Sequence, residues 1–451
     1  MRVFLFALAV GVPLASLWAA ATTGDEGYAT HDRSRLALSN PAPALDEPER
    51  AAFAAGRAIF TQPWLVAPSV AQPAFQGLGP LYNRLSCAGC HLHDGRGDMP
   101  DASGASLHAA IVRLSVSDAH GVHADPVYGQ QLQTEGIPGV PPEGRATVDW
   151  QPSTQVLADG TTVPMRAPRL RLEGLHYGPL GTGSMTSLRL APALVGIGLL
   201  EAIPADGVVA QAAAERADPD GVRGQPNWVP DVRTGRLALG RLGLKANQSG
   251  VRQQVETALY EDMGITSAAF PAQNCTAAES ACREASSGRQ PEATQAQITA
   301  LVAYVYGLAV PARAQADGPA VRAGERLFDR LGCAACHRPT WRTGRFPAFA
   351  ALSEREIHPY TDLLLHDMGP GLADGRPDGR ADGRQWRTAP LWGLGLAGTV
   401  SGDARYLHDG RARSLPEAIL WHGGEAAAAR DRYRRLEAGE RAELAAFLES
   451  L

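Results

Sequence analysis

The sequence contains the pattern Cys-x-x-Cys-His twice, once from Cys87 to His91 and once from Cys333 to His337. Two thiols three positions apart can form thioethers with the two vinyl groups of one porphyrin, and the following histidine can then bind the iron. A thioredoxin-like motif needs neither that histidine nor a second copy, and structural zinc needs cysteine pairs that converge on one metal. The pattern therefore predicts two covalently bound haem c groups, attached through Cys87, Cys90, Cys333 and Cys336, with His91 and His337 as iron ligands.

The residues before the two motifs form a repeat, which indicates the helices that position them. Gly56 and Phe60 precede the first motif, and Gly324 and Phe328 precede the second at the same spacing. One helical turn separates the two residues, so a bare backbone would let another helix cross closely while the aromatic ring covers the haem. Each half also ends in an amphipathic pattern, with apolar residues at 298, 301, 302 and 305 and at 444, 447, 448 and 451.

These elements predict a mainly α protein with two cytochrome c-like haem domains, residues 45–311 and 317–451. Its 451 residues exceed what one core usually supports. The first domain is expected to be enlarged by long loops and insertions, because 31 residues separate Gly56 from Cys87 whereas nine separate Gly324 from Cys333.

The amino terminus has the features of an export signal. Arg2 is followed by an apolar run from Val3 to Trp18 and then by alanines at 19–21. Residues 1–21 are therefore predicted to be a signal peptide, with an uncleaved membrane anchor as the alternative. We expect a periplasmic mature protein without a membrane span.

Export and composition narrow the possibilities further. In an oxidising compartment, Cys275 and Cys282 are predicted to form a local structural disulfide. The chain has 42 basic and 47 acidic residues and no basic run, so the sequence does not indicate nucleic-acid binding.

Several further motifs accompany the two Cys-x-x-Cys-His patterns in a fixed order. They are Cys90–Gly97, Gly198–Pro204, Lys245–Gln248, His366–Gly369, Arg387–Gly393, Leu407–Arg411 and Ala418–Gly424. In these segments the sequence resembles the di-haem oxidoreductase family, whose members are described as peroxidases or thiol oxidoreductases and are related to bacterial di-haem cytochrome c peroxidases. One departure is that Leu242 and Leu244 stand where family members commonly have aromatic residues.

The resemblance suggests a second axial ligand for the C-terminal haem. In the related peroxidases a methionine after a short helix completes this haem, and here the segment from Ser414 to Trp421 leads into His422. His422 is the first choice, and Met368 is the competitor because thioether ligation is common in cytochromes c. His408 is expected to bind Asp409 or a propionate instead.

The second axial ligand of the N-terminal haem is left open by the sequence. His108, His120, His123, His176 and Met185 are the candidates. The stretch that contains His176 and Tyr177 resembles a segment that lines the peroxidatic haem in the relatives. His176, Tyr177 and Glu201 are therefore the predicted catalytic residues, with Glu201, or alternatively Glu173, as the carboxylate acid or base.

The resemblance also bears on function, partners and ions. It implies an oxidoreductase that passes electrons from the C-terminal haem to a catalytic N-terminal haem, which reduces hydrogen peroxide. A small cytochrome or cupredoxin would donate the electrons. The alternatives are a non-catalytic electron-transfer cytochrome and a di-haem oxidase of a partner protein. Calcium is a further candidate at Asp374, Asp378 and Asp382 or at Asp218 and Asp220, although a loop with internal charge pairing is the simpler interpretation.

Overall fold

The computed structural model describes residues 27–119, 121–285 and 288–451. The predicted signal peptide, residues 1–21, lies outside this part of the chain, as does His120. The longer α-helices are α1 (Glu47–Thr61), α3 (Ala205–Ala214), α4 (Val251–Met263), α6 (Gln295–Tyr306), α7 (Pro319–Arg330) and α11 (Ala438–Ser450). The shorter α-helices are α2 (Ile197–Glu201), α5 (Ser280–Glu284), α8 (Ala397–Ser401), α9 (Leu415–Trp421) and α10 (Ala427–Tyr433).

Two helix crossings repeat along the chain, as the sequence predicted. α1 packs against α6, and α7 packs against α11. A Cβ atom on Gly56 would overlap the carbonyl oxygen of Ala300, and one on Gly324 would overlap that of Glu443. Glycine is therefore required at both crossings, because any side chain would push the two helices apart.

Local capping explains where these helices begin. The Asp46 side chain accepts a hydrogen bond from the Glu49 backbone N–H at 2.8 Å, and the Glu49 carboxylate accepts one from the Asp46 N–H. Thr294 and Gln297 form the same reciprocal pair at the start of α6. Such capping boxes satisfy N–H groups that have no partner within the helix.

The expectation of a mainly α protein is wrong. The fold is mixed, with 31% helix and 19% strand in several small sheets, and its halves are not clearly mainly α cytochrome c domains. Much of the strand content lies in residues 107–190, where apolar and polar residues alternate, as in the Val112, Leu114 and Val116 series. This period of two places the apolar residues on one face, where Val112 and Leu114 pack against Met99, Leu107 and Leu188, while Arg113 and Ser115 are buried on the other face.

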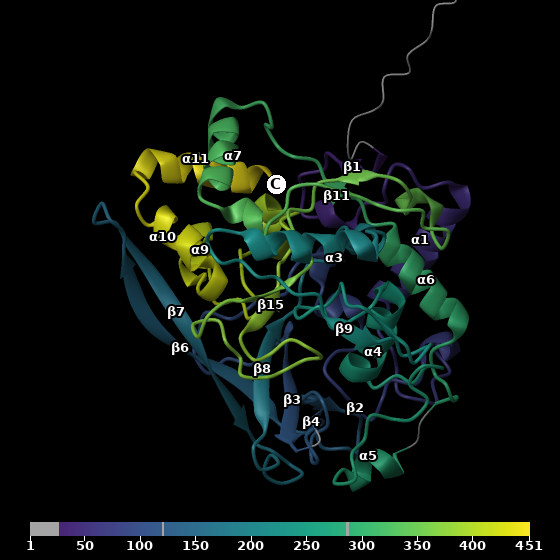
Figure 1. Cartoon of the computed structure of the whole chain (residues 1–451). Helices are drawn as coiled ribbons and strands as arrows, with labels where there is room; N and C mark the ends of the chain where they lie inside the picture. Colours follow the sequence, from purple (N-terminus) through teal and green to yellow (C-terminus); the bar gives the residue numbers. More distant parts are fainter. Residues whose placement is uncertain (1–26, 120, 286–287) are drawn as a thin grey trace, which may run out of the picture.

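The two largest sheets are formed by strands that lie between residues 110 and 190. β3 (Ala110–Asp118) is central between β4 (Gly121–His123) and β8 (Met185–Leu190), and β6 (Arg145–Val156) pairs with β7 (Thr162–Glu173) in a long antiparallel hairpin. Figure 1 shows this hairpin running along one side of the molecule toward α9 and α10. The remaining strands form two-stranded pairs: β1 (Ala29–Thr30) with β11 (Val310–Pro311), β2 (Leu81–Tyr82) with β5 (Glu135–Gly136), β9 (Trp228–Pro230) with β10 (Leu237–Leu239), β12 (Trp341–Arg342) with β13 (Glu356–Ile357), and β14 (Leu365–Asp367) with β15 (Gln385–Arg387).

The hydrophobic cores draw residues from both halves of the chain. The largest core combines α1, α4 and α6 with Leu352, Trp392 and Val400 from the C-terminal half. The core around α7 and α11 includes Leu157 and Met165 from the β6–β7 hairpin. The division at residues 311–317 stays a prediction; both of these cores cross it, whereas the core around β3 lies within the first half.

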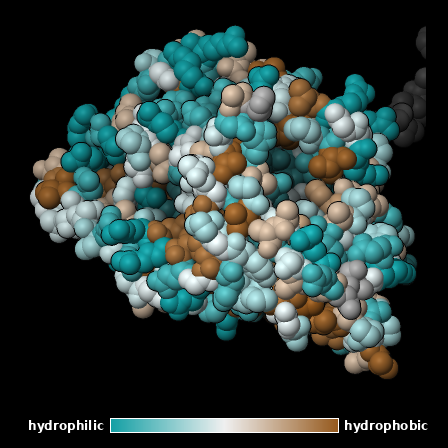
Figure 2. Space-filling model, turned by 90° about the horizontal axis from the view of Figure 1, so that it is seen from below, coloured by the Kyte–Doolittle hydropathy of each residue, from teal (hydrophilic) through white to brown (hydrophobic). Residues whose placement is uncertain are grey.

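The surface and the remaining cysteines complete the description. Seen from below, hydrophobic residues lie in small groups among hydrophilic ones (Figure 2). Within the described ranges, no helix is both long and apolar enough to cross a membrane. The predicted disulfide between Cys275 and Cys282 is confirmed.

Candidate haem sites

Both Cys-x-x-Cys-His motifs form a tight turn, which follows α7 almost directly in the second half but comes well after the end of α1 at Thr61 in the first. Cys87–Gly89 and Cys333–Ala335 are single 3₁₀ turns, and the N–H groups of His91 and His337 donate to the carbonyls of Cys87 and Cys333 at 3.0 and 2.9 Å. None of the four motif cysteines takes part in a disulfide. Phe60 and Phe328 lie beside the two histidine rings, with centroid distances of 6.5 and 6.3 Å. The predicted pairing of helix, aromatic ring and motif is therefore present twice.

The two motif histidines are held in the tautomer that a metal requires. Nδ1 of His91 lies 2.8 Å from the carbonyl oxygen of Pro192, and Nδ1 of His337 lies 2.9 Å from that of Tyr360. Because a carbonyl only accepts, Nδ1 carries the proton and Nε2 keeps a free lone pair. Burial lowers the pKa of each imidazole to about 4, so both rings are neutral at physiological pH.

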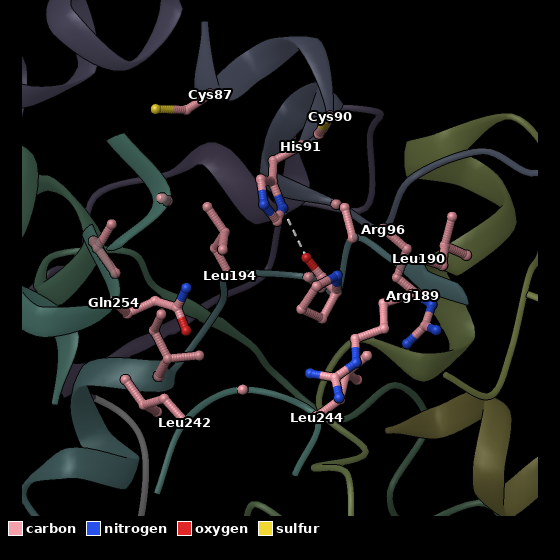
Figure 3. A pocket seen from close by; sticks show the side chains of 18 of the residues that line it. Cys87, Cys90, His91, Arg96, Arg189, Leu190, Leu194, Leu242, Leu244 and Gln254 are labelled. Carbon is pink, nitrogen blue, oxygen red and sulfur yellow. Dashed lines mark hydrogen bonds between the residues drawn. The ribbon is translucent and has the colours of Figure 1, made fainter. Parts of the chain in front are cut away.

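A large cavity of about 300 Å³ opens beside the first motif (Figure 3). Cys87, Cys90 and His91 form one wall, and α4, α6 and β8 contribute others. The segment from Arg387 to Ser401, in the C-terminal half, closes the remaining side. Leu242 and Leu244 also line this cavity, at the end away from the cysteines in Figure 3.

Several buried donors in the cavity wall have no partner in the described chain. They are Nε of Arg96, Nε of Arg113, Nη2 of Arg189 and Nε1 of Trp392. Arg113 pairs with Glu261 and Arg189 pairs with Asp378, whereas Arg96 and Arg387 form no ion pair among the described residues. Burial lowers the pKa of both Arg96 and Arg387 to about 10.

These features fit a haem. Two buried guanidinium groups without counterions match the two propionates of a haem, since guanidinium binds a carboxylate in a bidentate fork. Arg387 begins one of the segments that carry the family resemblance. Arg96 was missed, although it lies in the quoted segment that follows His91.

The lining of this cavity offers the iron few second ligands. Among its described residues, His91 is the one histidine, and methionine and lysine are absent. Nδ1 of His108 lies near Arg84, Nε2 of His123 lies 3.2 Å from Asp118, and Met185 begins β8, all outside the lining. None of the candidates that the structure describes therefore lines the cavity beside His91.

The structure does not bring the three predicted catalytic residues to this cavity. The Tyr177 hydroxyl donates to the Pro141 carbonyl at 2.8 Å, and the His176 N–H donates to the Glu143 carbonyl. Glu201 accepts a hydrogen bond at 2.7 Å from the Val251 N–H at the start of α4, and another from the Tyr306 hydroxyl. Glu201 therefore satisfies a helix terminus, and none of the three lies in the lining.

A different carboxyl group lies in the cavity wall. Asp262, near the end of α4, accepts a 2.8 Å hydrogen bond from the Gln131 amide. Burial raises its pKa to about 6. Its charge also raises the pKa values of Cys87 and Cys90, which places it near the motif thiols. Sequence reasoning missed Asp262 because nothing local distinguishes it from other acidic residues at helix ends.

The second motif has a partner histidine of matching geometry. Nδ1 of His422, at the end of α9, lies 2.9 Å from the Ala418 carbonyl, so its Nε2 is also free. Burial lowers the pKa of His422, and His422 in turn contributes to the lowered pKa of His337. Such coupling requires the two rings to lie near each other.

Met368 lies close to His422 but faces other surroundings. Its carbonyl oxygen would be 3.0 Å from a Cβ on Gly423. Met368 lines a separate cavity of about 330 Å³, together with Met165 and Trp421. His337 and the motif cysteines are not among the residues that line it. The geometry therefore favours His422 over Met368.

A buried histidine lies beside the second motif. Nδ1 of His366 is 3.7 Å from the Cys336 sulfur and 2.8 Å from Glu425, and Nε2 is 2.8 Å from Asp362. Burial alone would lower the pKa of His366, but Asp362 and the other hydrogen-bond partners raise it well above its usual value. The sequence singled out the segment His366–Gly369 only through the family resemblance.

His408 contacts a tryptophan. Its ring stacks on Trp386 with centroids 3.8 Å apart, and Nε2 lies 3.4 Å from Asp409, the partner expected from the sequence.

The acidic turns that suggested calcium are occupied by cations of the chain itself. Asp374 binds the fully buried Lys245 at 2.8 Å, and Asp378 binds Arg189 at 3.0 Å. Asp220 binds Arg432 through both carboxylate oxygens. The expected internal charge pairing is present, but Lys245 and Arg189 come from outside the loop and bury part of it.

Comparisons with known proteins agree with this site. The family model described as "di-haem oxidoreductase, putative peroxidase" matches residues 18–121 and 151–451. No curated protein matches the chain significantly. Among solved structures, hydrazine synthase of Kuenenia stuttgartiensis, pressurised with 20 bar xenon, aligns over 100% of both chains with 14% identity and a TM-score of 0.37, which is too low to carry an argument. Because the family model spans most of the chain and both motifs, this protein belongs to the di-haem oxidoreductase family and is an oxidoreductase that uses haem.

Proposed function

We propose that the protein is a peroxidase-type di-haem oxidoreductase. Cys87 and Cys90 hold one haem c covalently with His91 as ligand, and Cys333 and Cys336 hold the other between His337 and His422. Electrons pass from the C-terminal site to the N-terminal site, where hydrogen peroxide is reduced. The observation that carries this proposal is the inequality of the two sites: His422 offers a free Nε2 near His337, whereas the described lining around His91 holds no second histidine or methionine.

The overall reaction consumes one hydrogen peroxide, two protons and two electrons and yields two water molecules. When bound, the haem supplies the redox chemistry and the metal that peroxide approaches. The protein supplies binding and protons. Arg96 and Arg387 hold the propionates, and His91 keeps its orientation through the Pro192 carbonyl.

Asp262 is the residue we assign to proton delivery. Its carboxyl group lines the cavity, accepts from Gln131 and has a pKa of about 6, near the range where a group can hold and release a proton efficiently. His176, Tyr177 and Glu201 stay predictions; none of the three lines the cavity beside His91.

The partner and the compartment extend the same proposal. A small cytochrome or cupredoxin donates the electrons, and the protein works in the periplasm after export by residues 1–21. The disulfide between Cys275 and Cys282 supports an oxidising compartment.

Electron paramagnetic resonance of the full-length protein with both haems tests the proposal. The oxidised or half-reduced protein should show one high-spin and one low-spin haem, and the high-spin signal should change when hydrogen peroxide is added. Two low-spin signals in both states, with no response to peroxide, would indicate an electron carrier instead.

A further inference from the structure

Helix α4 presents one long stripe of side chains to the cavity beside His91. Val251, Gln254, Val255 and Ala258 follow one another at helical spacing and all line this cavity. Val251, Val255 and Ala258 are apolar, so Gln254 is a polar residue among three apolar neighbours in the first half of this stripe, whereas Glu261 and Asp262 make its second half polar. Gln254 is partly buried and faces the cavity, so a haem that filled the cavity would bury its amide, which would then need a hydrogen-bond partner.

Among the described residues, the Gln254 side chain makes no hydrogen bond to the protein, and two neighbours in the chain show the contrast. Gln253 accepts from the Val232 N–H and the Ser249 hydroxyl and donates to the Pro230 carbonyl. Thr257, which also lines the cavity, directs its hydroxyl to Gln248 at 3.5 Å.

The orientation of Gln254 identifies where its partner would be. Figure 3 shows its amide reaching from α4 into the cavity, while His91 enters from the wall that carries Cys87 and Cys90. The Nδ1 atom of His91 is taken by Pro192, so its Nε2 is free to face the same space. The amide and the imidazole thus reach into one cavity from different walls.

We infer that the Gln254 amide is the hydrogen-bond donor to an oxygen-containing or anionic ligand at the open position of the N-terminal haem. The inference rests on the open position proposed above and adds the residue that contacts the substrate. Nε2 of the amide donates to the ligand atom, which fixes the orientation of peroxide and stabilises negative charge that develops on its oxygen. Asp262 lies eight residues further along the same helix, about 12 Å at 1.5 Å per residue, so it serves as a proton store rather than as a direct contact.

Fluoride is the probe for this contact, because it binds ferric haem as a small anion that accepts hydrogen bonds. In the holoprotein, Gln254→Leu should weaken fluoride binding about tenfold, the effect of losing one hydrogen bond to a charged group. Gln254→Asn, whose amide is one methylene shorter, should also weaken it. Thr257→Val is the matched control, since it removes a hydroxyl from the same wall, and should leave fluoride affinity unchanged.

The carbon monoxide complex of the reduced protein gives a second readout. Loss of the donor should raise the C–O stretching frequency in Gln254→Leu but not in Thr257→Val. Equal fluoride affinity in the original protein and Gln254→Leu, or equal weakening in Thr257→Val, would overturn the role of Gln254 and leave the open position intact. A change of Gln254→Leu from low spin to high spin before any ligand is added would also overturn it, because Gln254 would then be an iron ligand. Failure of the original protein to bind fluoride at all would instead reject the open position, and the inference with it.

Discussion

The two haem sites share one frame but differ in what surrounds it. Both have a glycine at a helix crossing, a phenylalanine beside the motif and a histidine whose Nδ1 is held by a carbonyl. The C-terminal site adds His422 from the end of the short helix α9. The N-terminal site adds a sheet, a large cavity and arginines from distant segments. In the proposed function the shared frame supplies the histidine ligand of each haem, and the additions determine whether the other side of the haem is closed or open.

Removing one attachment site at a time should have the largest effect. Cys87→Ser with Cys90→Ser should halve the haem content and abolish peroxide reduction, because the open site is lost. Haem content by absorbance and turnover with a reduced donor measure both effects. The matched pair Cys333→Ser with Cys336→Ser should keep the high-spin signal, and its disappearance there would contradict the assignment of roles.

Removing His422 should make the two sites alike. In His422→Ala the C-terminal haem loses its second ligand, so both haems should be high-spin in the oxidised protein. Electron paramagnetic resonance measures this change. Met368→Ala is the control and should leave the spectrum unaltered, whereas a spectrum that changes in Met368→Ala and not in His422→Ala would reverse the assignment.

The acidity of Asp262 should appear in the pH profile of the open site. Because its pKa is raised to about 6, the carboxyl group is protonated below that value and ionised above it. Turnover that depends on its proton should therefore fall as the pH rises through about 6. Asp262→Asn should lower turnover, by about 10² for a lost acid, and flatten the profile. An unchanged profile in this variant would assign the proton to another group.

Alanine at the two crossing glycines should have a smaller and nearly equal effect on stability. Gly56→Ala and Gly324→Ala should each destabilise the protein by about 1–3 kcal/mol, because the added methyl group overlaps a backbone carbonyl. Gly439→Ala is the control: it lies in α11 with no atom near its Cβ position and should stabilise slightly. Thermal unfolding of the three variants checks this, and no loss of stability at Gly324 would break the equivalence of the crossings.

The sequence predicted what depends on neighbouring residues. Gly56 and Phe60, and their counterparts Gly324 and Phe328, gave the two crossings because helical spacing is visible locally. The sheets were not predicted, because residues 107–190 contain glycine, proline and threonine. This composition suggested loops and outweighed the alternation in β3.

The chemistry of the open site could not be predicted in the same way. Arg96, Gln254, Asp262 and Arg387 are scattered along the chain and meet only in the folded cavity. Gln254 is recognisable in the sequence as a single amide among apolar residues at helical spacing. This pattern indicates a ligand contact only once the cavity that the residues face is known. Tyr177 and Glu201 illustrate the converse, since a plausible residue type was already engaged in packing or helix capping.

Because each half contributes residues to the other, the two halves could not easily be encoded as separate chains. A gene divided between residues 311 and 317 would leave the first product without Arg387 and Trp392, which close its cavity, and the second without Leu157 and Met165, which fill its core. The first fragment would lack part of its cavity wall, and the second would lack part of its core. The repeat shows two similar units in the sequence, but in the folded protein each unit depends on residues from the other.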